Sequence, residues 1–294
     1  PGATRRCELQ LEFADALRCA GEGAAMRRAF EDAAIRARSL GAPRLLARAA
    51  IGVTGRWVHE DASAVHLLEE SLATLPGDEF ALRALATARL ARTLYLLPDS
   101  RQRRERLCAE ARALAQRSGD PHVLAEVLAD SLEALFHNDS LAEQDALASA
   151  LEAAAVAADD ARLRLQSGAW RIVNAMRHGR LHDAEARLRE VARLAGDLRQ
   201  PRFLHQTAVF EAALLLARGR LAEAETRQQE ALALGMPIDE AMARWQHWTQ
   251  TSHLRREQGR LAEFLGEGLA QTLPAETPAA LFFANSARWV APHV

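Results

Sequence analysis

The segment GRLHDAE at residues 179–185 returns as GRLAEAE at residues 219–225 and as GRLAE at residues 259–263. Successive copies begin forty residues apart, and Leu141 extends the leucine of this segment one further step towards the N-terminus. Self-similarity at a period of about 20–50 residues is typical of solenoids, in which one helical or strand unit stacks on the next. We therefore expect a repeat architecture, which supplies a surface rather than a particular chemistry.

Glycine, proline and short polar runs separate stretches of roughly 15–20 residues, and Gly and Pro are the residues that most often end helices. Alanine and leucine dominate the stretches and β-branched residues are few, which favours helix over strand. We predict an all-α fold, an α-solenoid of about seven helix–turn–helix repeats in one domain over residues 1–294. The predicted repeats are 4–42, 44–76, 79–118, 121–159, 161–199, 201–236 and 238–273, and a terminal helix is predicted over 277–291.

The repeated segment makes two local predictions. Gly179, Gly219 and Gly259 should lie in turns between paired antiparallel helices, because glycine reaches left-handed backbone angles without strain. The leucine two residues after each glycine keeps its apolar character in every repeat, as a packed face should. We expect these leucines to be buried under the next hairpin; they are Leu141, Leu181, Leu221 and Leu261.

The charge balance is nearly even, with 37 basic and 39 acidic residues and a net charge of −2. Nucleic-acid-binding domains usually carry a strong basic excess, so we expect no direct binding to nucleic acid. No apolar run reaches the roughly 18–20 residues of a membrane span, so we expect no membrane partner. Cys7, Cys19 and Cys108 are odd in number and lack paired spacing, which favours a reducing, cytoplasmic setting.

The sequence contains no lysine, since all 37 basic residues are arginine. A phosphate-binding P-loop and Schiff-base chemistry both need lysine, so neither fits this chain. His178 and His182 have the i, i+4 spacing of a metal-binding pair, but Gly179 breaks the helix between them. We predict no catalytic residue, no metal and no cofactor.

Residues forty apart occupy equivalent positions in successive first helices, so a purely structural position should keep one chemical character. The positions of Trp170, Arg171 and Asn174 do not, because aromatic, charged, amide and apolar side chains alternate there. We predict a concave binding face formed by Trp170, Arg171, Asn174, Glu211 and Gln250, in which arginine offers a planar fork and tryptophan a stacking surface. The alternative is that Arg171 and Glu211 simply pair with each other across adjacent helices.

A second group of aromatic and histidine side chains comprises Trp245, His247 and Trp248, with polar residues between and after them. A helix with this composition is too polar all round to be wholly buried. The group could form a recognition surface, because tryptophan offers a large area and a hydrogen-bond donor. It could equally close the end of the solenoid over its last layers, and the sequence leaves both interpretations open.

The first predicted repeat places Met26, Phe30 and Ala33 where the tetratricopeptide motif has Ala, Phe and Ala. The chain therefore resembles tetratricopeptide repeats, although its repeats are longer and the aromatic first half of the motif is degraded. The resemblance implies a right-handed superhelix whose first helices line a concave groove. Such a groove would take a protein or peptide partner, or a small-molecule inducer.

A narrower resemblance rests on five segments: residues 55–58, 67–72, 170–173, 198–201 and 254–261. They are similar to the C-terminal repeat region of large bacterial ATP-binding regulators of the maltose-regulator and LuxR type. The resemblance implies covalently linked ATPase and output domains in the full-length protein, with the repeats acting as a non-catalytic interaction or sensor scaffold. The alternative is a small-molecule receptor that binds its inducer inside the superhelix.

Overall fold

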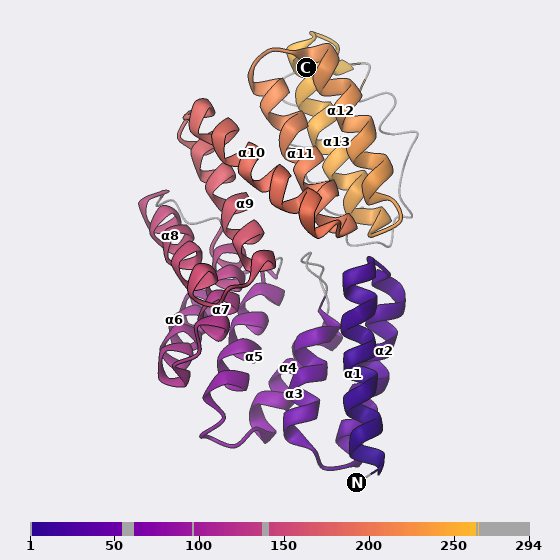
Figure 1. The fold of residues 1–294 in the computed structure, drawn as a ribbon, viewed down its shortest axis with the longest axis vertical. Helices are drawn as coiled ribbons and strands as arrows, with labels where there is room; N and C mark the ends of the chain where they lie inside the picture. Colours follow the sequence, from indigo (N-terminus) through magenta and orange to yellow (C-terminus); the bar gives the residue numbers. More distant parts are fainter. Residues whose placement is uncertain (1, 55–61, 96, 137–140, 263, 265–294) are drawn as a thin grey trace. The chain divides into compact units, whose positions relative to one another are not determined.

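The computed structural model describes residues 2–54, 62–95, 97–136, 141–262 and 264 (Figure 1). Every regular element in these ranges is an α-helix, so the predicted all-α class is confirmed. The helices are α1 (Gly2–Ala20), α2 (Gly23–Ser39), α3 (Pro43–Val53), α4 (Ala62–Thr74), α5 (Phe80–Thr93), α6 (Arg101–Ser118), α7 (Pro121–Ala134), α8 (Leu141–Ala157), α9 (Ala161–Arg177), α10 (Leu181–Leu198), α11 (Pro201–Ala217), α12 (Leu221–Gly235) and α13 (Glu240–Glu257). The predicted terminal helix 277–291 lies outside the described residues, as does the end of the predicted repeat 238–273.

The chain divides into two compact units, Pro1–Gly179 and Arg180–Val294. In the first unit each helix from α1 to α9 packs on the next, and the odd-numbered helices also contact one another. The second unit repeats this pattern, since α10 to α13 pack consecutively and α11 contacts α13. The predicted repeat 161–199 thus contributes α9 to the first unit and α10 to the second.

The turn glycines have nearly the same backbone conformation. Gly179, Gly219 and Gly259 have φ angles of 71°, 72° and 70°. The first two lie between consecutive helices and the third follows α13, so the forty-residue period places glycine where the chain needs a left-handed residue. In each case the glycine N–H donates to the carbonyl three residues earlier.

Aspartate begins three of the first helices. The Asp160 carboxylate accepts hydrogen bonds from the N–H groups of Arg162 and Leu163, at 2.8 Å and 3.1 Å. Asp120 and Asp239 accept one such bond each at the starts of α7 and α13. These bonds satisfy N–H groups that have no partner within the helix, which fixes where the helix starts.

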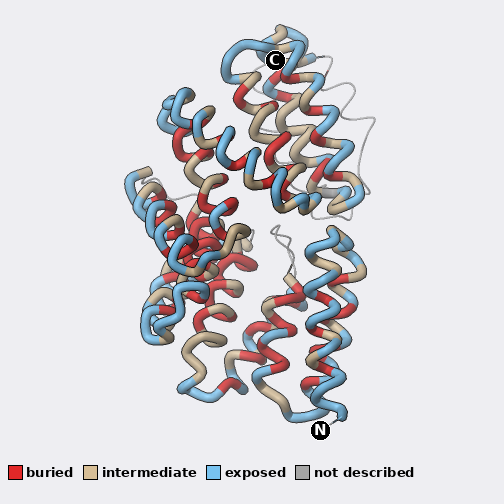
Figure 2. The backbone as a smooth tube through the Cα atoms, in the orientation of Figure 1, coloured by how far each residue is buried: buried red, intermediate tan, exposed pale blue. Residues whose placement is uncertain are grey.

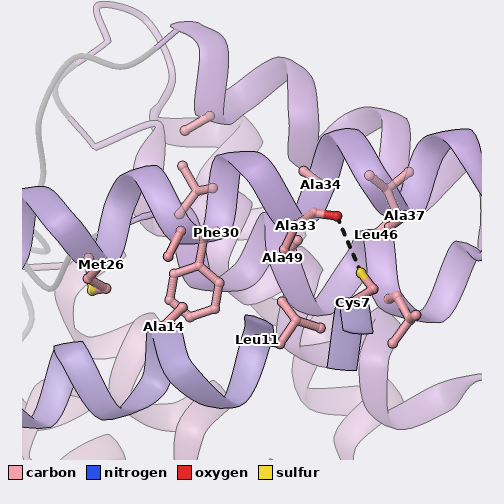
Figure 3. Close-up of a cluster of buried hydrophobic side chains, with 14 residues drawn as sticks. Cys7, Leu11, Ala14, Met26, Phe30, Ala33, Ala34, Ala37, Leu46 and Ala49 are labelled. Atoms are coloured by element: carbon pink, nitrogen blue, oxygen red, sulfur yellow. Dashed lines mark hydrogen bonds between the residues drawn. The ribbon is translucent and has the colours of Figure 1, made fainter. Parts of the chain in front are cut away.

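Within each unit, buried residues lie on the sides of the helices that face one another, whereas exposed residues lie on the outer sides (Figure 2). In the first layers Phe30 lies among Leu11, Ala14 and other small apolar residues (Figure 3). Its ring leaves no space at Gly52, where an added Cβ would lie 2.2 Å from it. Small residues therefore set how closely α2 and α3 approach.

The structure corrects the prediction for the leucines. All four are only partly buried, because each is the first residue of its helix, where the helix end reaches the surface. The buried position lies three residues later, one turn into the helix. Its occupants along the chain are Gln144, Ala184, Ala224 and Phe264.

One ion pair recurs between a second helix and the first helix that follows it. Its acidic members are forty residues apart in the sequence. The pairs are Asp145–His178 at 2.9 Å, Glu185–Arg218 at 2.8 Å and Glu225–Arg255 at 2.6 Å. Ion pairs this exposed stabilise little, but they show that α8–α9, α10–α11 and α12–α13 share a similar register.

Candidate functional site

The five residues predicted to form a binding face fall in different units. Trp170, Arg171 and Asn174 lie on α9 in the first unit, whereas Glu211 lies on α11 and Gln250 on α13 in the second. The structure therefore brings the first three together on one helix. Glu211 contacts α12 and Gln250 contacts α11, and the two are described separately.

Arg171 and Glu211 each have an ion-pair partner on a neighbouring helix of their own unit. The Arg171 guanidinium is 3.0 Å from Glu152 on α8 and also donates to the Ser149 hydroxyl at 3.1 Å. Glu211 accepts from the Arg227 Nε on α12 at 2.6 Å. Local pairing accounts for both charges, with partners other than those the sequence suggested.

Gln250 links two helices of the second unit. Its Nε2 donates to the Val209 carbonyl at 2.8 Å. One turn earlier on α13, the Gln246 side chain bonds to His205, whose other ring nitrogen donates to the Ala231 carbonyl. These bonds satisfy polar groups inside the layer, so Gln250 has a structural role here.

The group of Trp245, His247 and Trp248 is half-buried on α13. The Trp248 ring packs on Phe264, with ring centroids 5.1 Å apart and planes tilted by 46°. Burial lowers the pKa of His247, which favours its neutral form. The contact with Phe264 supports packing over the last layer as the role of Trp248.

Asn174 differs from the other predicted residues. It is 1% exposed, and neither its Oδ1 nor its Nδ2 has a hydrogen-bond partner among the residues that the structure describes. One turn earlier, Trp170 packs against Phe136 with ring centroids 5.6 Å apart. Buried amides are nearly always hydrogen-bonded in folded proteins, so this side chain needs an explanation.

The sequence analysis missed a buried charge network in the first unit. Asp130 on α7 accepts from Arg89 Nε at 2.8 Å and lies 3.1 Å from Arg92 Nη1, both on α5. Arg92 also lies 3.6 Å from Glu133, and Arg89 reaches the Thr54 hydroxyl at the end of α3. The side chains of Arg92 and Asp130 are 5% and 4% exposed, so each charge depends on its partners.

The network continues to α9. Glu126, one turn before Asp130, binds Arg162, and its carboxylate is held ionised because Arg162 and Arg89 outweigh the effect of burial and lower its pKa. On α1, Arg18 pairs with Asp15 of its own helix at 3.1 Å, and its pKa is lowered because burial, with the positive charges of Arg89 and Arg162, outweighs the Asp15 carboxylate. We call the residues on these four odd-numbered helices the charged face; they are Arg18, Arg89, Arg92, Glu126, Asp130, Glu133 and Arg162.

The charged face had a signal in the sequence. Arg89 and Arg92, like Asp130 and Glu133, are three residues apart, which puts each pair on one side of its helix. Asp130 follows Arg89 by one period plus one residue, the same separation that joins His205 to Gln246. A search of the sequence for oppositely charged residues at this separation, on alternate helices, would have identified the network.

No group of three or more His, Cys, Asp or Glu side chains in the described ranges is arranged to hold a metal ion. Of the helices that the structure describes, none is both long and apolar enough to cross a membrane. No family model matches the chain, and neither does any curated protein. The proposed function therefore rests on the chemistry of the charged face and of the region around Asn174.

Proposed function

We propose that this chain is a non-catalytic interaction and sensor module, built as a tetratricopeptide-like right-handed superhelix. Its charged face takes a protein or peptide partner. The observation that carries the proposal is the charged face itself, in which ionised groups on α5, α7 and α9 pair with one another across the helices.

The chemistry of the charged face favours a peptide with charges of both signs. Arg18 and Arg162 retain 35% and 27% side-chain exposure, and Glu126 retains 15%. These groups can meet solvent or a partner, whereas Asp130 and Arg92 beneath them are fixed by burial. Charges held in place before binding add specificity and speed to association.

The sequence segments similar to bacterial ATP-binding regulators supply the second part of the proposal. The chain is the repeat region of such a transcription or signalling regulator, acts in the cytoplasm, and is covalently linked to ATPase and output domains. It binds no cofactor, nucleic acid or membrane. The coding sequence on either side of this chain tests this, since it should encode a nucleotide-binding motif upstream.

Peptide selection tests the interaction directly. Random peptides displayed on phage would be selected on the purified chain, and the affinities of the selected peptides measured by isothermal titration calorimetry. Arg18→Gln and Arg162→Gln should weaken binding about tenfold, as expected for loss of a partly desolvated charge contact. Circular dichroism would confirm that both variants fold.

Arg193→Gln is the matched control, because Arg193 is 74% exposed on α10 and pairs only with Asp197 of the same helix. It should leave the affinity unchanged. If no peptide is selected, or if every selected peptide binds the Arg18 and Arg162 variants as tightly as the wild type, the proposal fails.

The second candidate function is a small-molecule receptor that binds its ligand inside the repeats. The observation that favours it is the buried amide of Asn174, which no group in the described ranges satisfies.

A further inference from the structure

Because the chain repeats every forty residues, one buried contact can be compared between successive layers. Arg104 on α6 donates to the carbonyl of Ala134 on α7, thirty residues further along the chain. The positions forty residues later are Gln144 and Asn174. The two layers after that hold Ala184 with Leu214 and Ala224 with Leu254.

The later layers fill these positions with apolar side chains. Ala184, Ala224 and Leu254 are fully buried and Leu214 is 4% exposed. Alanine opposite leucine packs without any hydrogen bond, so these two positions need no polar partner in the later layers.

The α8–α9 layer instead has two amides. Gln144 is fully buried, and its Nε2 donates to the Leu135 carbonyl at the end of α7 at 2.7 Å. In the described part of the chain its Oε1 has no partner, and neither polar atom of the Asn174 amide has one. At these two positions the α8–α9 layer leaves three buried polar atoms without a partner among the described residues, whereas the later layers are apolar there. Such atoms are destabilising unless a further group satisfies them.

Two contacts fix where these amides lie. His178 bonds to Asp145 at 2.9 Å, and Arg171 bonds to Ser149 at 3.1 Å, which sets the antiparallel register of α8 and α9. In that register Gln144 and Asn174 come within about one helical turn of each other along the interface. Both lie at the end of α8–α9 where Trp170 packs on Phe136.

We propose that Gln144 and Asn174 bind an uncharged planar ligand with an amide-type edge. A free carboxamide presents a donor and an acceptor side by side, and its complement is a ring edge with an acceptor beside a donor, as in nucleobases and nicotinamide. Trp170 and Phe136 supply aromatic surface for such a ring. The carboxylates nearby, Asp145 and Glu152, are bonded to His178 and Arg171, and the Arg177 guanidinium lies over the Phe136 ring, 5.5 Å from its centre, which favours a neutral ligand.

This inference does not depend on the charged face, because none of its residues belongs to it. The test uses the full chain with adenine, uracil and nicotinamide as probes, measured by thermal shift and calorimetry. At least one probe should raise the melting temperature of the wild type and give a measurable Kd.

The decisive variant is Gln144→Ala/Asn174→Leu, which installs the residues of the next two layers. It should lose affinity about tenfold or more, as removal of a bidentate hydrogen bond does, and should melt at a higher temperature without ligand. Asn174→Asp keeps the shape of the side chain and removes the Nδ2 donor, so it should also lose affinity. It serves as the second variant in case the double variant does not fold.

Gln228→Ala is the matched control, because Gln228 is another buried glutamine, 1% exposed on α12, with its Nε2 unpaired. It should bind the probe as the wild type does. The inference is overturned if no probe binds the wild type, or if the double variant or Asn174→Asp binds as tightly. Binding of a selected peptide to the charged face would be unaffected by either result.

Discussion

One pair of equivalent positions is polar in the α8–α9 layer of the first unit and apolar in the two layers of the second unit. Gln144 and Asn174 occupy it in the first unit, whereas alanine and leucine occupy it at Ala184–Leu214 and Ala224–Leu254. The register is similar in all three layers, as the recurring ion pairs show. A repeat therefore fixes where a side chain lies but leaves its chemistry free, and the exceptional layer is where function is to be sought.

The largest loss of stability is expected when an amide side chain is placed in an apolar layer. Leu214→Asn should destabilise the second unit by about 3–6 kcal/mol, because it removes buried leucine contacts and adds an amide without partners. Guanidinium denaturation measures this. Leu234→Asn, at an exposed leucine on α12, is the control and should change little. A loss below about 1 kcal/mol at Leu214 would mean that this layer tolerates an amide and that the Asn174 layer is unexceptional.

The charged face offers a second contrast, between polar groups that are buried with partners and amides that lack them. Asp130→Ala should destabilise by about 3–5 kcal/mol, because it leaves Arg89 and Arg92 buried without their shared carboxylate. Asp197→Ala removes an exposed carboxylate on α10 and should have no measurable effect. Similar melting curves for the two variants would show that the network does not hold α5 to α7.

Gly52 and Gly196 both lie within helices, but their surroundings differ. Gly52→Ala should destabilise by about 1–3 kcal/mol, because the new Cβ would overlap the buried Phe30 ring. Gly196→Ala on α10 meets nothing within 4 Å and should stabilise by about 0.5–1 kcal/mol through helix propensity. Thermal denaturation distinguishes them by sign, and a Gly52 variant as stable as the wild type would mean that α2 and α3 can move apart.

The smallest expected effect concerns the recurring ion pair. The hydrogen bond from Arg255 outweighs burial and lowers the pKa of Glu225. Since this pKa is lower in the folded than in the unfolded state, the pair stabilises above the unfolded pKa, and that contribution is lost as the pH falls through the folded pKa. Arg255→Ala should raise the pKa of Glu225 in a carbon-13 NMR titration, whereas Arg256→Ala should not. An unchanged value would show that the pair does not form in solution.

The five predicted site residues show how far the sequence could go. It singled out Asn174 as an irregular position, because the forty-residue alignment needs no structure. It could not tell that Arg171 and Glu211 find partners on neighbouring helices, since those partners, Glu152 and Arg227, do not follow the forty-residue spacing. The Arg89–Asp130 contact was missed for a related reason, because it joins helices that are not consecutive in the chain.

By itself the sequence determined the helices, the left-handed turns at Gly179 and Gly219, and the aspartate that begins α9, because these depend on a few neighbouring residues. Only the tertiary structure decided which side of each helix is buried. The leucine at the start of α10 is partly exposed and Ala184 is buried, because burial depends on helices that pack from elsewhere in the chain. The same reason explains why Asn174 could be recognised as unusual from the sequence, but its unpaired amide could be seen only in the packed layer.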